Sequence, residues 1–397
     1  MNSSTTYRKK LIILLSRFPY PLEKGDKLRA YNQIKVLSNY YSITLITLTD
    51  KSIPRESIEQ LRSLCKTIYI FRLSPISIFF NVFFQFLTNK PFQIGYFYSN
   101  RNFHRIKSIL KEVKPDHIYC QLIRVSEYVK DYHDCKKTID FMDAFSVGIE
   151  RRIEKSSKFT KWLFRSESKR LTLYERQIFE YFENHTIISE QDQQLIMHPK
   201  KNNIKIIANG VDNSFFETIN KEVEYDLVFV GNMSYIPNIE AVNFISNEIL
   251  PLLNTSEKKY SLFISGANPH PSIIKLAKHN PAIKISGWVN DIRSSYLKGK
   301  IFIAPMMIGT GMQNKLLEAM ALGIPCITTP LANNAIKGIN YESILVANTK
   351  YEFANAVQLL LNDENLYNKI SENGKKLVLE NFDWNKTTMD LIKLFEK

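Results

Sequence analysis

The chain has 397 residues, of which 44% are hydrophobic and 23% charged, and this composition excludes disorder as its main state. The length favours two or three domains, each with its own core. The balance of 53 Lys and Arg against 39 Asp and Glu gives a net charge of +14, which favours an anionic partner such as nucleic acid, membrane lipid or a phosphorylated ligand.

The amino-terminal apolar run covers only residues 11–15, and a signal peptide needs roughly 7–15 apolar residues. We therefore expect the first buried strand there. The apolar stretch 76–87 is interrupted by Asn81 and Gln85 and is too short to span a bilayer, so no transmembrane helix is expected. The cysteines have neither C-x-x-C nor metal-ligand spacing, which predicts reduced thiols and a cytoplasmic location. They are Cys65, Cys120, Cys135 and Cys326.

Short apolar runs that end in small or polar residues alternate with helical stretches along the whole chain. In the first half these runs are residues 10–16, 42–49, 66–73, 117–121, 136–143, 185–189 and 204–208. In the second half they are residues 226–231, 262–266, 283–287, 301–305, 324–329 and 343–347. Such alternation predicts an α/β protein with parallel sheets. Two strand series predict two Rossmann-like domains facing each other across a cleft.

The break between the two series falls in residues 209–226, which begin with an Asn-Gly turn signal and lack periodicity. We place the domains at 1–214 and 215–380, with a last helix at 381–397 that returns to the first domain. Because ligands of open α/β sheets bind at the carboxyl ends of the strands, the site is expected at those ends.

The stretch GTGMQNKLLEAMALG (309–323) follows one predicted strand and continues as a helix. Its glycines allow a ligand to approach the backbone, and the amides at the helix start favour an anion. Lys315 adds a positive charge, and Glu318, about 60° away around the helix, can accept hydrogen bonds from a diol such as ribose. Phosphate beside sugar hydroxyls describes a nucleoside diphosphate. A capped helix with a solvated Lys–Glu pair is an equal alternative by spacing alone.

The same stretch, extended to residue 329, is similar to the donor-site signature of GT-B glycosyltransferases of family 4, in the exopolysaccharide-type branch. Residues 226–244 and 287–305 also resemble donor-domain segments of that family. NGVD (209–212) matches its interdomain crossing, and residues 16–38 match the start of its acceptor domain. The resemblance therefore follows the chain in order over nearly its whole length.

The resemblance implies an enzyme that transfers a sugar, with retention and without metal or other cofactor, from a nucleotide-diphosphate sugar to a glycan or polyprenyl-diphosphate-linked acceptor. It implies that Lys315 holds the diphosphate, that Glu318 binds the ribose, and that Trp288 and Val289 lie against the base. Gly25 should approach the donor phosphates from the other domain. The backbone expected at the phosphates and the sugar comprises Gly309, Thr310, Gly311, Met312 and Gln313.

The chain departs from the family at two places. Thr310 stands where relatives have a glutamate, and Asn232 stands where an arginine is frequent. These departures leave Lys315 as the main cationic clamp. They also keep open a non-catalytic GT-B subunit that binds nucleotide sugar or activates a partner. A nucleotide-sugar epimerase of the same fold is a further alternative.

Candidate residues on the acceptor side lie in the first domain. Asp143 ends a predicted strand and is the expected catalytic or acceptor-binding group, whereas Asp140, three positions earlier, should point away and serve structure. Asp26 is either a helix N-cap or a catalytic group. Arg29 either holds an acceptor phosphate or is a solvated surface residue.

Several other polar residues are expected to serve local structure. Ser189 and Glu190 should start a helix, Asn238 should be an N-cap, and Asn209 should shape the turn at the crossing. No Asp-x-Asp pair and no metal-type histidine spacing occurs in the sequence, so no metal ligands are predicted.

Residues 150–176 carry nine Lys or Arg against four Glu, with Trp162, Leu163 and Phe164 among them. A basic helix with aromatic residues can bind an anionic membrane surface, and the Phe-rich stretch 76–87 adds to that interpretation. The alternative is a solvated helix whose aromatic residues pack on the domain. Peripheral attachment to the inner face of the cytoplasmic membrane is thus one option.

Two other functional classes are disfavoured by the sequence. No nucleic-acid reader motif is present, so nucleic acid is not an expected partner. A dehydrogenase would need G-x-G-x-x-G after a first strand, and neither half of the chain has it.

Overall fold

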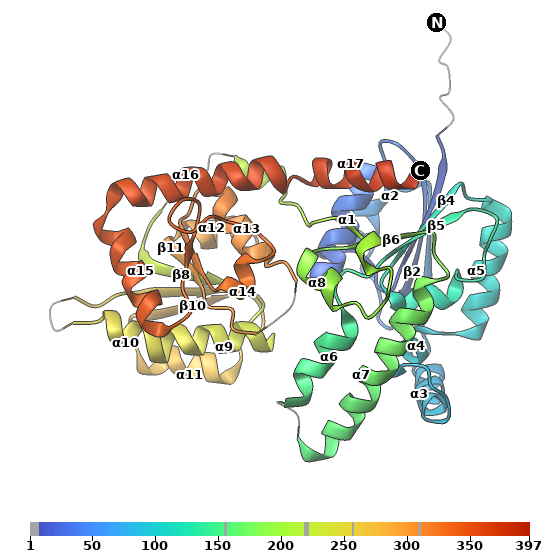
Figure 1. Ribbon diagram of the computed structural model, residues 1–397, viewed down its shortest axis with the longest axis horizontal. Coiled ribbons are helices and arrows are strands. Elements are labelled where there is room, and N and C mark those ends of the chain that lie inside the picture. The colour runs from blue at the N-terminus through green and yellow to red at the C-terminus, as the bar shows by residue number, and fades with distance from the viewer. Residues whose placement is uncertain (1–7, 155–156, 218–221, 256–257, 309–310) are drawn as a thin grey trace, which may run out of the picture. The chain divides into compact units, whose positions relative to one another are not determined.

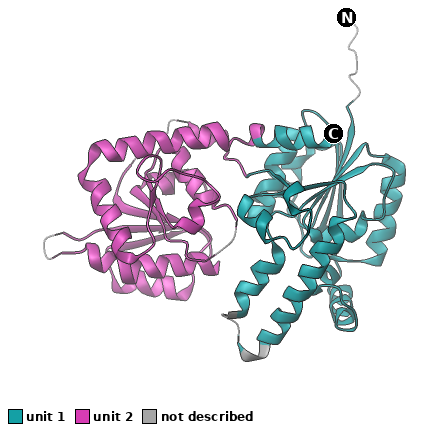
Figure 2. Cartoon of the chain, in the orientation of Figure 1, with its two compact units in different colours: residues 1–208, 387–397 teal, residues 209–386 magenta. Residues whose placement is uncertain are grey.

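The computed structural model describes residues 8–154, 157–217, 222–255, 258–308 and 311–397. The chain forms two compact units, shown in Figure 2. Unit 1 comprises residues 1–208 and 387–397, and unit 2 comprises residues 209–386. The change of unit thus lies six residues before the expected boundary, and the returning segment begins six residues after the expected position. Gly210, just after the change of unit, packs closely against the start of α17 (Trp384–Phe395), because a Cβ there would lie 2.5 Å from the backbone nitrogen of Trp384.

Unit 1 is built on a parallel sheet with the strand order β3-β2-β1-β4-β5-β6-β7. Its strands are β1 (Lys10–Leu15), β2 (Ser42–Thr49), β3 (Thr67–Arg72), β4 (His117–Gln121), β5 (Lys136–Asp140), β6 (Asn184–Ile187) and β7 (Lys205–Ile206). Six of the seven fall within the apolar runs expected in the first half of the chain, and β6 overlaps the run 185–189 but begins one residue earlier.

The helices of unit 1 connect these strands, as Figure 1 shows. They are α1 (Gly25–Leu37), α2 (Arg55–Arg62), α3 (Pro75–Phe84), α4 (Phe92–Phe97), α5 (Asn100–Val113), α6 (Phe145–Glu154), α7 (Lys158–Phe179) and α8 (Glu190–Leu195). Three short 3₁₀ segments accompany them: η1 (Gln85–Leu87), η2 (Ile123–Tyr128) and η3 (Lys201–Asn203). Ser189 caps α8 through its hydroxyl, which confirms the predicted helix start.

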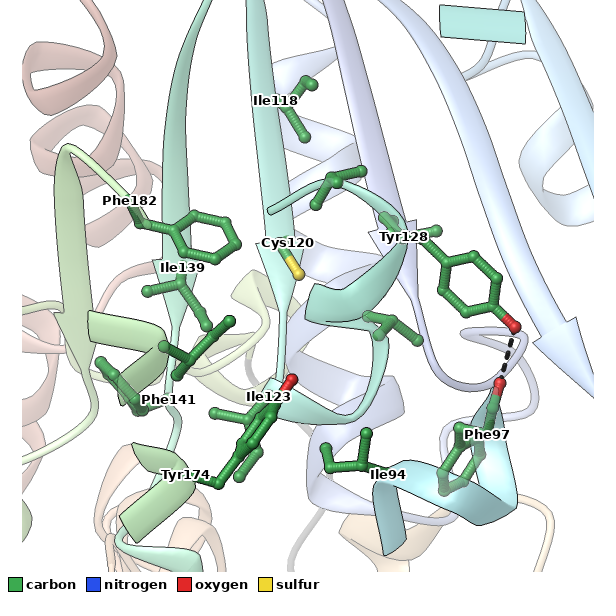
Figure 3. Packing of buried hydrophobic residues seen from close by; sticks show 14 of the residues in the cluster. Ile94, Phe97, Ile118, Cys120, Ile123, Tyr128, Ile139, Phe141, Tyr174 and Phe182 are labelled. Atoms are coloured by element: carbon green, nitrogen blue, oxygen red, sulfur yellow. Dashed lines mark hydrogen bonds between the residues drawn. The ribbon is translucent and has the colours of Figure 1, made fainter. Parts of the chain in front are cut away.

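The core of unit 1 lies on both faces of the sheet, because alternate residues of β1 point to opposite sides. Leu11 and Ile13 pack in a cluster that includes residues of α1 and of the returning segment 387–397. Ile12 and Leu14 belong to the other cluster, which includes residues of α4, α5 and α7. Figure 3 shows part of the second cluster, with the Tyr128 hydroxyl donating to the carbonyl of Phe97.

Unit 2 is built on a parallel sheet with the strand order β10-β9-β8-β11-β12-β13. Its strands are β8 (Tyr225–Val230), β9 (Leu262–Ser265), β10 (Ile283–Gly287), β11 (Gly299–Ala304), β12 (Cys326–Thr328) and β13 (Leu345–Val346). In each sheet the chain starts centrally, builds outward to one edge and then crosses to the other side. The predicted α/β class with two Rossmann-like units is confirmed.

The helices of unit 2 follow the same alternation. They are α9 (Ile236–Phe244), α10 (Leu250–Leu253), α11 (Pro271–His279), α12 (Ile292–Leu297), α13 (Asn314–Ala321), α14 (Pro330–Asn333), α15 (Lys350–Asn362), α16 (Glu364–Asn381) and α17 (Trp384–Phe395). A 3₁₀ segment, η4 (Asn213–Phe216), precedes β8, and a π-helical turn, η5 (Ile245–Ile249), joins α9 to α10. Helix α17 begins in unit 2 and ends in unit 1.

Two further observations concern the chain as a whole. All four cysteines are free thiols, and three of them are buried. Across the described ranges, no helix combines the length and the apolar character that a membrane span requires.

Candidate active site

Lys315 lies where the strand order of unit 2 reverses, between β8 and β11. It is the second residue of α13, and its Nζ donates a hydrogen bond to Oδ1 of Asn238 in α9. The same ammonium lies 5.1 Å from the ring centroid of Phe229 in β8 and 3.9 Å from the sulfur of Met306, just after β11. Because ligands of doubly wound sheets bind at such a reversal, Lys315 occupies the expected place for a donor ligand.

The environment of Lys315 and Glu318 opposes charge on both groups. Burial lowers the pKa of Lys315 to about 7, against the opposing effect of Glu318. Burial likewise raises the pKa of Glu318 to about 7, although the Tyr296 hydroxyl donates to its Oε2 at 2.7 Å. Both side chains are only partly accessible and have separate partners. The alternative of a solvated Lys–Glu pair is therefore wrong.

Asn238 is not an N-cap, contrary to prediction. Helix α9 begins at Ile236 with Tyr235 as its cap residue, so Asn238 lies inside the first turn. Its Nδ2 donates to the carbonyl oxygen of Asn232 at 2.8 Å, which leaves Oδ1 to accept from Lys315. The amide is thus fixed at one end by the loop after β8 and presents the other end to the ammonium.

Two glycines permit this arrangement. A Cβ on Gly231 would lie 2.7 Å from Nδ2 of Asn238. A Cβ on Gly266, whose φ is +145°, would lie 1.7 Å from the carbonyl oxygen of Gly231. The loops after β8 and β9 can therefore pack together only without these side chains. Sequence reasoning did not propose Asn238 or the two glycines for the site, although each glycine is the last residue of an apolar run.

The remaining donor-side candidates lie at the same edge of the sheet. Gly311 has a φ of +80°, and Met312 and Gln313 follow it immediately before α13, all three partly buried. Trp288 directly follows β10 and is 68% exposed, with Val289 next to it. The predicted residues Gly309 and Thr310 lie outside the described residues.

Asn209 connects the crossing segment to the donor-side helix. It is buried, and its Nδ2 donates to Oδ1 of Asn314, the first residue of α13, at 3.0 Å. The first residue of unit 2 is in this way tied to the helix that carries Lys315.

In unit 1, Asp143 lies just after β5, at the carboxyl edge of the sheet. It follows Met142, whose φ of +63° is unusual for a residue with a side chain. Its buried Oδ1 has no hydrogen-bond partner among the described residues. Burial and the nearby Asp192 carboxylate raise its pKa to about 7, against the opposing charge of Arg124. Strained backbone and an unsatisfied oxygen are features of functional positions.

Asp192 and Arg151 extend this cluster, and sequence reasoning missed both. Asp192 in α8 is buried, it accepts from the Ser189 hydroxyl, and burial raises its pKa to about 6. Its Oδ1 and Nη1 of Arg151 are buried and without a hydrogen-bond partner among the described residues. Asp143, Asp192 and Arg151 thus each have one buried polar atom without a hydrogen-bond partner among the described residues. Asp192 interacts electrostatically with both of the others.

Asp26 is also not an N-cap. Helix α1 begins at Gly25, and Lys24 is the cap residue. The Asp26 carboxylate instead pairs with Arg17 at 2.8 Å. The backbone carbonyl of Asp26 accepts a hydrogen bond from Nε2 of Gln121 at 3.2 Å. These contacts join the loop after β1, the start of α1 and the end of β4. A Cβ on Gly25 would meet no atom within 4 Å, so the backbone there is open to a ligand.

The structure corrects the prediction for Arg29 as an acceptor-side residue. Its side chain is fully buried, and its Nε lies 2.7 Å from Oδ2 of Asp140. Asp140 also accepts from the hydroxyls of Tyr119 at 2.8 Å and Thr186 at 3.0 Å. Arg29 is neither solvated nor accessible to a phosphate, because its charge is neutralised inside the core. The structural role predicted for Asp140 is confirmed.

Comparison with known proteins places the second half of the chain in a known family. Residues 224–363 match the family model of glycosyl transferases group 1. A protein encoded in the cps region of Klebsiella pneumoniae is 24% identical over 97% of this chain and 99% of its own length.

Two solved structures have the same fold over nearly the whole chain. Sucrose-phosphate synthase from Thermosynechococcus elongatus is 13% identical, with a TM-score of 0.72 over 98% of each chain. Anabaena HepE, solved in complex with UDP and glucose, is 12% identical, with a TM-score of 0.68 over 97% of this chain and 99% of its own. The donor signature, the two sheets and these likenesses agree: residues 224–363 match the glycosyl transferases group 1 family, and the chain is a glycosyltransferase with the GT-B fold.

Proposed function

We propose that this enzyme transfers a sugar, with retention at the anomeric carbon, from a nucleoside-diphosphate sugar to a glycan or polyprenyl-diphosphate-linked acceptor of a cell-surface polysaccharide. The observation that carries the donor assignment is the position of Lys315, held by Asn238 at the reversal of the sheet order. A relative encoded in a cps region supports the polysaccharide context. The UDP bound by HepE supports a nucleotide donor.

In this proposal the residues of unit 2 bind the donor. Lys315 and the amides of residues 311–313 hold the diphosphate, and Glu318 accepts hydrogen bonds from the ribose. The exposed indole of Trp288, with Val289, lies against the base. A diphosphate supplies the negative charge that a half-buried ammonium lacks, so donor binding and the charged form of Lys315 favour each other.

During transfer, the bond between the anomeric carbon and the diphosphate oxygen breaks, and the acceptor oxygen forms a bond to the same carbon. The acceptor proton passes to the departing phosphate, so a strong general base is not needed. The ammonium and the amides stabilise the charge that develops on the leaving group. Asp143 and Asp26 contact the acceptor, and Gly25 approaches the donor phosphates with its backbone.

A panel of UDP-, GDP- and dTDP-sugars tests the proposal, with thermal shift as the binding readout and nucleotide release as the activity readout. One donor should stabilise the protein, and release should accelerate only with an acceptor. Lys315→Ala should lose at least tenfold in donor affinity and keep the circular-dichroism spectrum of the wild type. The anomeric proton in the NMR spectrum of the product reports retention or inversion.

A non-catalytic subunit remains the second candidate, because of Thr310 and Asn232. It predicts donor binding without transfer to any acceptor in the panel. Conversion of the donor sugar without an acceptor would instead indicate an epimerase. If no donor binds, the proposal is wrong.

A further inference from the structure

Helix α3 and the segment η1 present most of their large apolar residues to solvent. None of the ten residues of α3 is buried. Phe79 is 67% exposed and Leu87 is 76% exposed. The other exposed large apolar residues of this stretch are Ile76, Phe80, Phe83, Phe84 and Phe86. Their spacing of three and four residues places them along one stripe of the helix.

The inward side of α3 combines polar residues with Ile78, which packs against the core of unit 1. Asn81 donates through Nδ2 to the carbonyl of Tyr98 at 2.6 Å, and Nε2 of Gln85 donates to the carbonyl of Asn81 at 3.1 Å. Gly95 in α4 lies against Gln85, since a Cβ on it would approach Cγ of Gln85 to 2.6 Å. These contacts fix the rotation of α3, so the exposed apolar stripe is a built feature of the fold.

Helix α7 extends the apolar stripe. Trp162 is 59% exposed, and its ring centroid lies 6.3 Å from that of Phe86. Arg170 connects α7 to the end of η1 by donating to the carbonyl oxygens of Gln85 and Thr88. Figure 1 shows α3 at the end of unit 1 toward which α6 and α7 extend. We call the seven exposed residues of 76–87, together with Trp162, the aromatic surface.

The exposed charged residues of α7 beside the aromatic surface are cations, whereas Glu167, between them in sequence, is buried. The sequence has no acidic residue between Glu59 and Glu112. On α7, Arg165 and Lys169 are exposed, three and seven residues after Trp162, and therefore on the same side of the helix. Exposed aromatic rings bordered by cations suit a surface with an apolar interior and anionic headgroups.

We propose that the aromatic surface binds the interface of an anionic lipid bilayer, with the Phe side chains among the acyl chains and Arg165 and Lys169 at the headgroups. The ten residues of α3 are too few to cross a bilayer, so the helix lies along the interface. A second copy of the chain fits less well, because a two-fold contact would bring the same cations together. The proposal does not depend on the identity of the donor or the acceptor.

Flotation of the full-length protein with vesicles of phosphatidylcholine and phosphatidylglycerol tests it. The wild type should float at low salt and should detach as salt or the phosphatidylcholine fraction rises. Phe79→Ser/Phe83→Ser should weaken binding at least tenfold. Arg165→Glu/Lys169→Glu should weaken binding about fivefold or more for each cation removed. A matched control, Tyr351→Ser/Leu379→Ser, removes two exposed apolar residues of unit 2 and should bind like the wild type.

Quenching of tryptophan fluorescence by brominated lipids gives a second measurement, which does not depend on a variant that fails to bind. These lipids should quench the fluorescence of the wild type, and most of that quenching should disappear in Trp162→Phe. The proposal is overturned if the wild type does not bind anionic vesicles at low salt, or if Phe79→Ser/Phe83→Ser binds as well as the control. A concentration-dependent dimer that these two substitutions abolish, without vesicle binding, would assign the surface to a second copy and also overturn it.

Discussion

At the scale of single residues, the proposed site contains groups whose charge is poorly solvated. Lys315 and Asp143 both have a pKa of about 7, one lowered and the other raised by burial. Each can therefore change its protonation state near neutral pH when a charged ligand arrives. The two groups lie at the carboxyl edges of different sheets, where ligands of this fold class bind.

Donor binding should be coupled to proton uptake by Lys315. At pH 8 the free ammonium is mostly deprotonated, and a bound diphosphate raises its pKa by adding opposite charge. The donor affinity should then fall by up to about tenfold per pH unit above 7. Donor binding can be measured by calorimetry at pH 8 in phosphate and in Tris. The two binding enthalpies should differ by nearly the difference between the ionisation enthalpies of the two buffers, because almost one proton is taken up from the buffer. Lys315→Ala should show no such difference, and a wild type without it would contradict the role of Lys315.

Asp143 should reduce stability as the pH rises from about 4 to about 7. In this window the folded protein keeps the Asp143 proton while the unfolded chain has lost it, so the folded state binds more protons and loses stability with rising pH. Asp143→Asn removes this contribution. Relative to the wild type, the variant's free energy of unfolding should be about 1–2 kcal/mol more favourable at pH 8 than at pH 4, after allowance for partial exposure. Urea unfolding at the two pH values measures it. The exposed Asp131→Asn is the control, and an equal response of both variants would contradict the assignment.

At the scale of elements, the loops after β8 and β9 position the donor-side helix. Gly266→Ala places a Cβ against the carbonyl oxygen of Gly231, so the loop that holds Asn238 must move. We expect a loss of about 3 kcal/mol or more in stability, together with weaker donor binding.

Gly287→Ala is the matched control for this variant. Gly287 also has a positive φ, +72°, but a Cβ there would meet no atom within 4 Å. Only backbone strain of about 1 kcal/mol is expected. Thermal unfolding with and without donor compares the two variants. Equal losses would show that strain, not the contact between the loops, limits position 266.

The strands and helices also show which features could be predicted from the sequence. Buried parallel strands are continuous apolar runs, and each strand of the described structure falls within or overlaps a run that the sequence marks. Lys315 and Glu318 could be proposed from the sequence because phosphate-binding helices have a local signature. Asn238, Asp192 and the pairing of Arg29 with Asp140 were missed or misread. Each depends on a contact between segments far apart in the chain, which no local spacing encodes.

At the scale of the whole molecule, the chain ends in the unit where it began. Residues 387–397 group with unit 1, and Leu391, Ile392 and Phe395 join its core cluster beside β1 and α1. The ring of Phe395 stacks on that of His117 with centroids 4.3 Å apart. The last segment is thus part of the core of unit 1, although all of unit 2 separates them in sequence.

Phe395→Ala should therefore weaken unit 1 and leave unit 2 unchanged. Removing a buried ring leaves a cavity beside His117 and Tyr119 and should cost about 3–5 kcal/mol. Hydrogen exchange by mass spectrometry can separate the units: amides of β1 and β4 should exchange faster, and those of β8 and β11 at the wild-type rate. Leu379→Ala, an exposed leucine of α16, should change neither set. Faster exchange confined to β8 and β11 would mean that the terminal helix supports unit 2, contrary to the grouping of the structure.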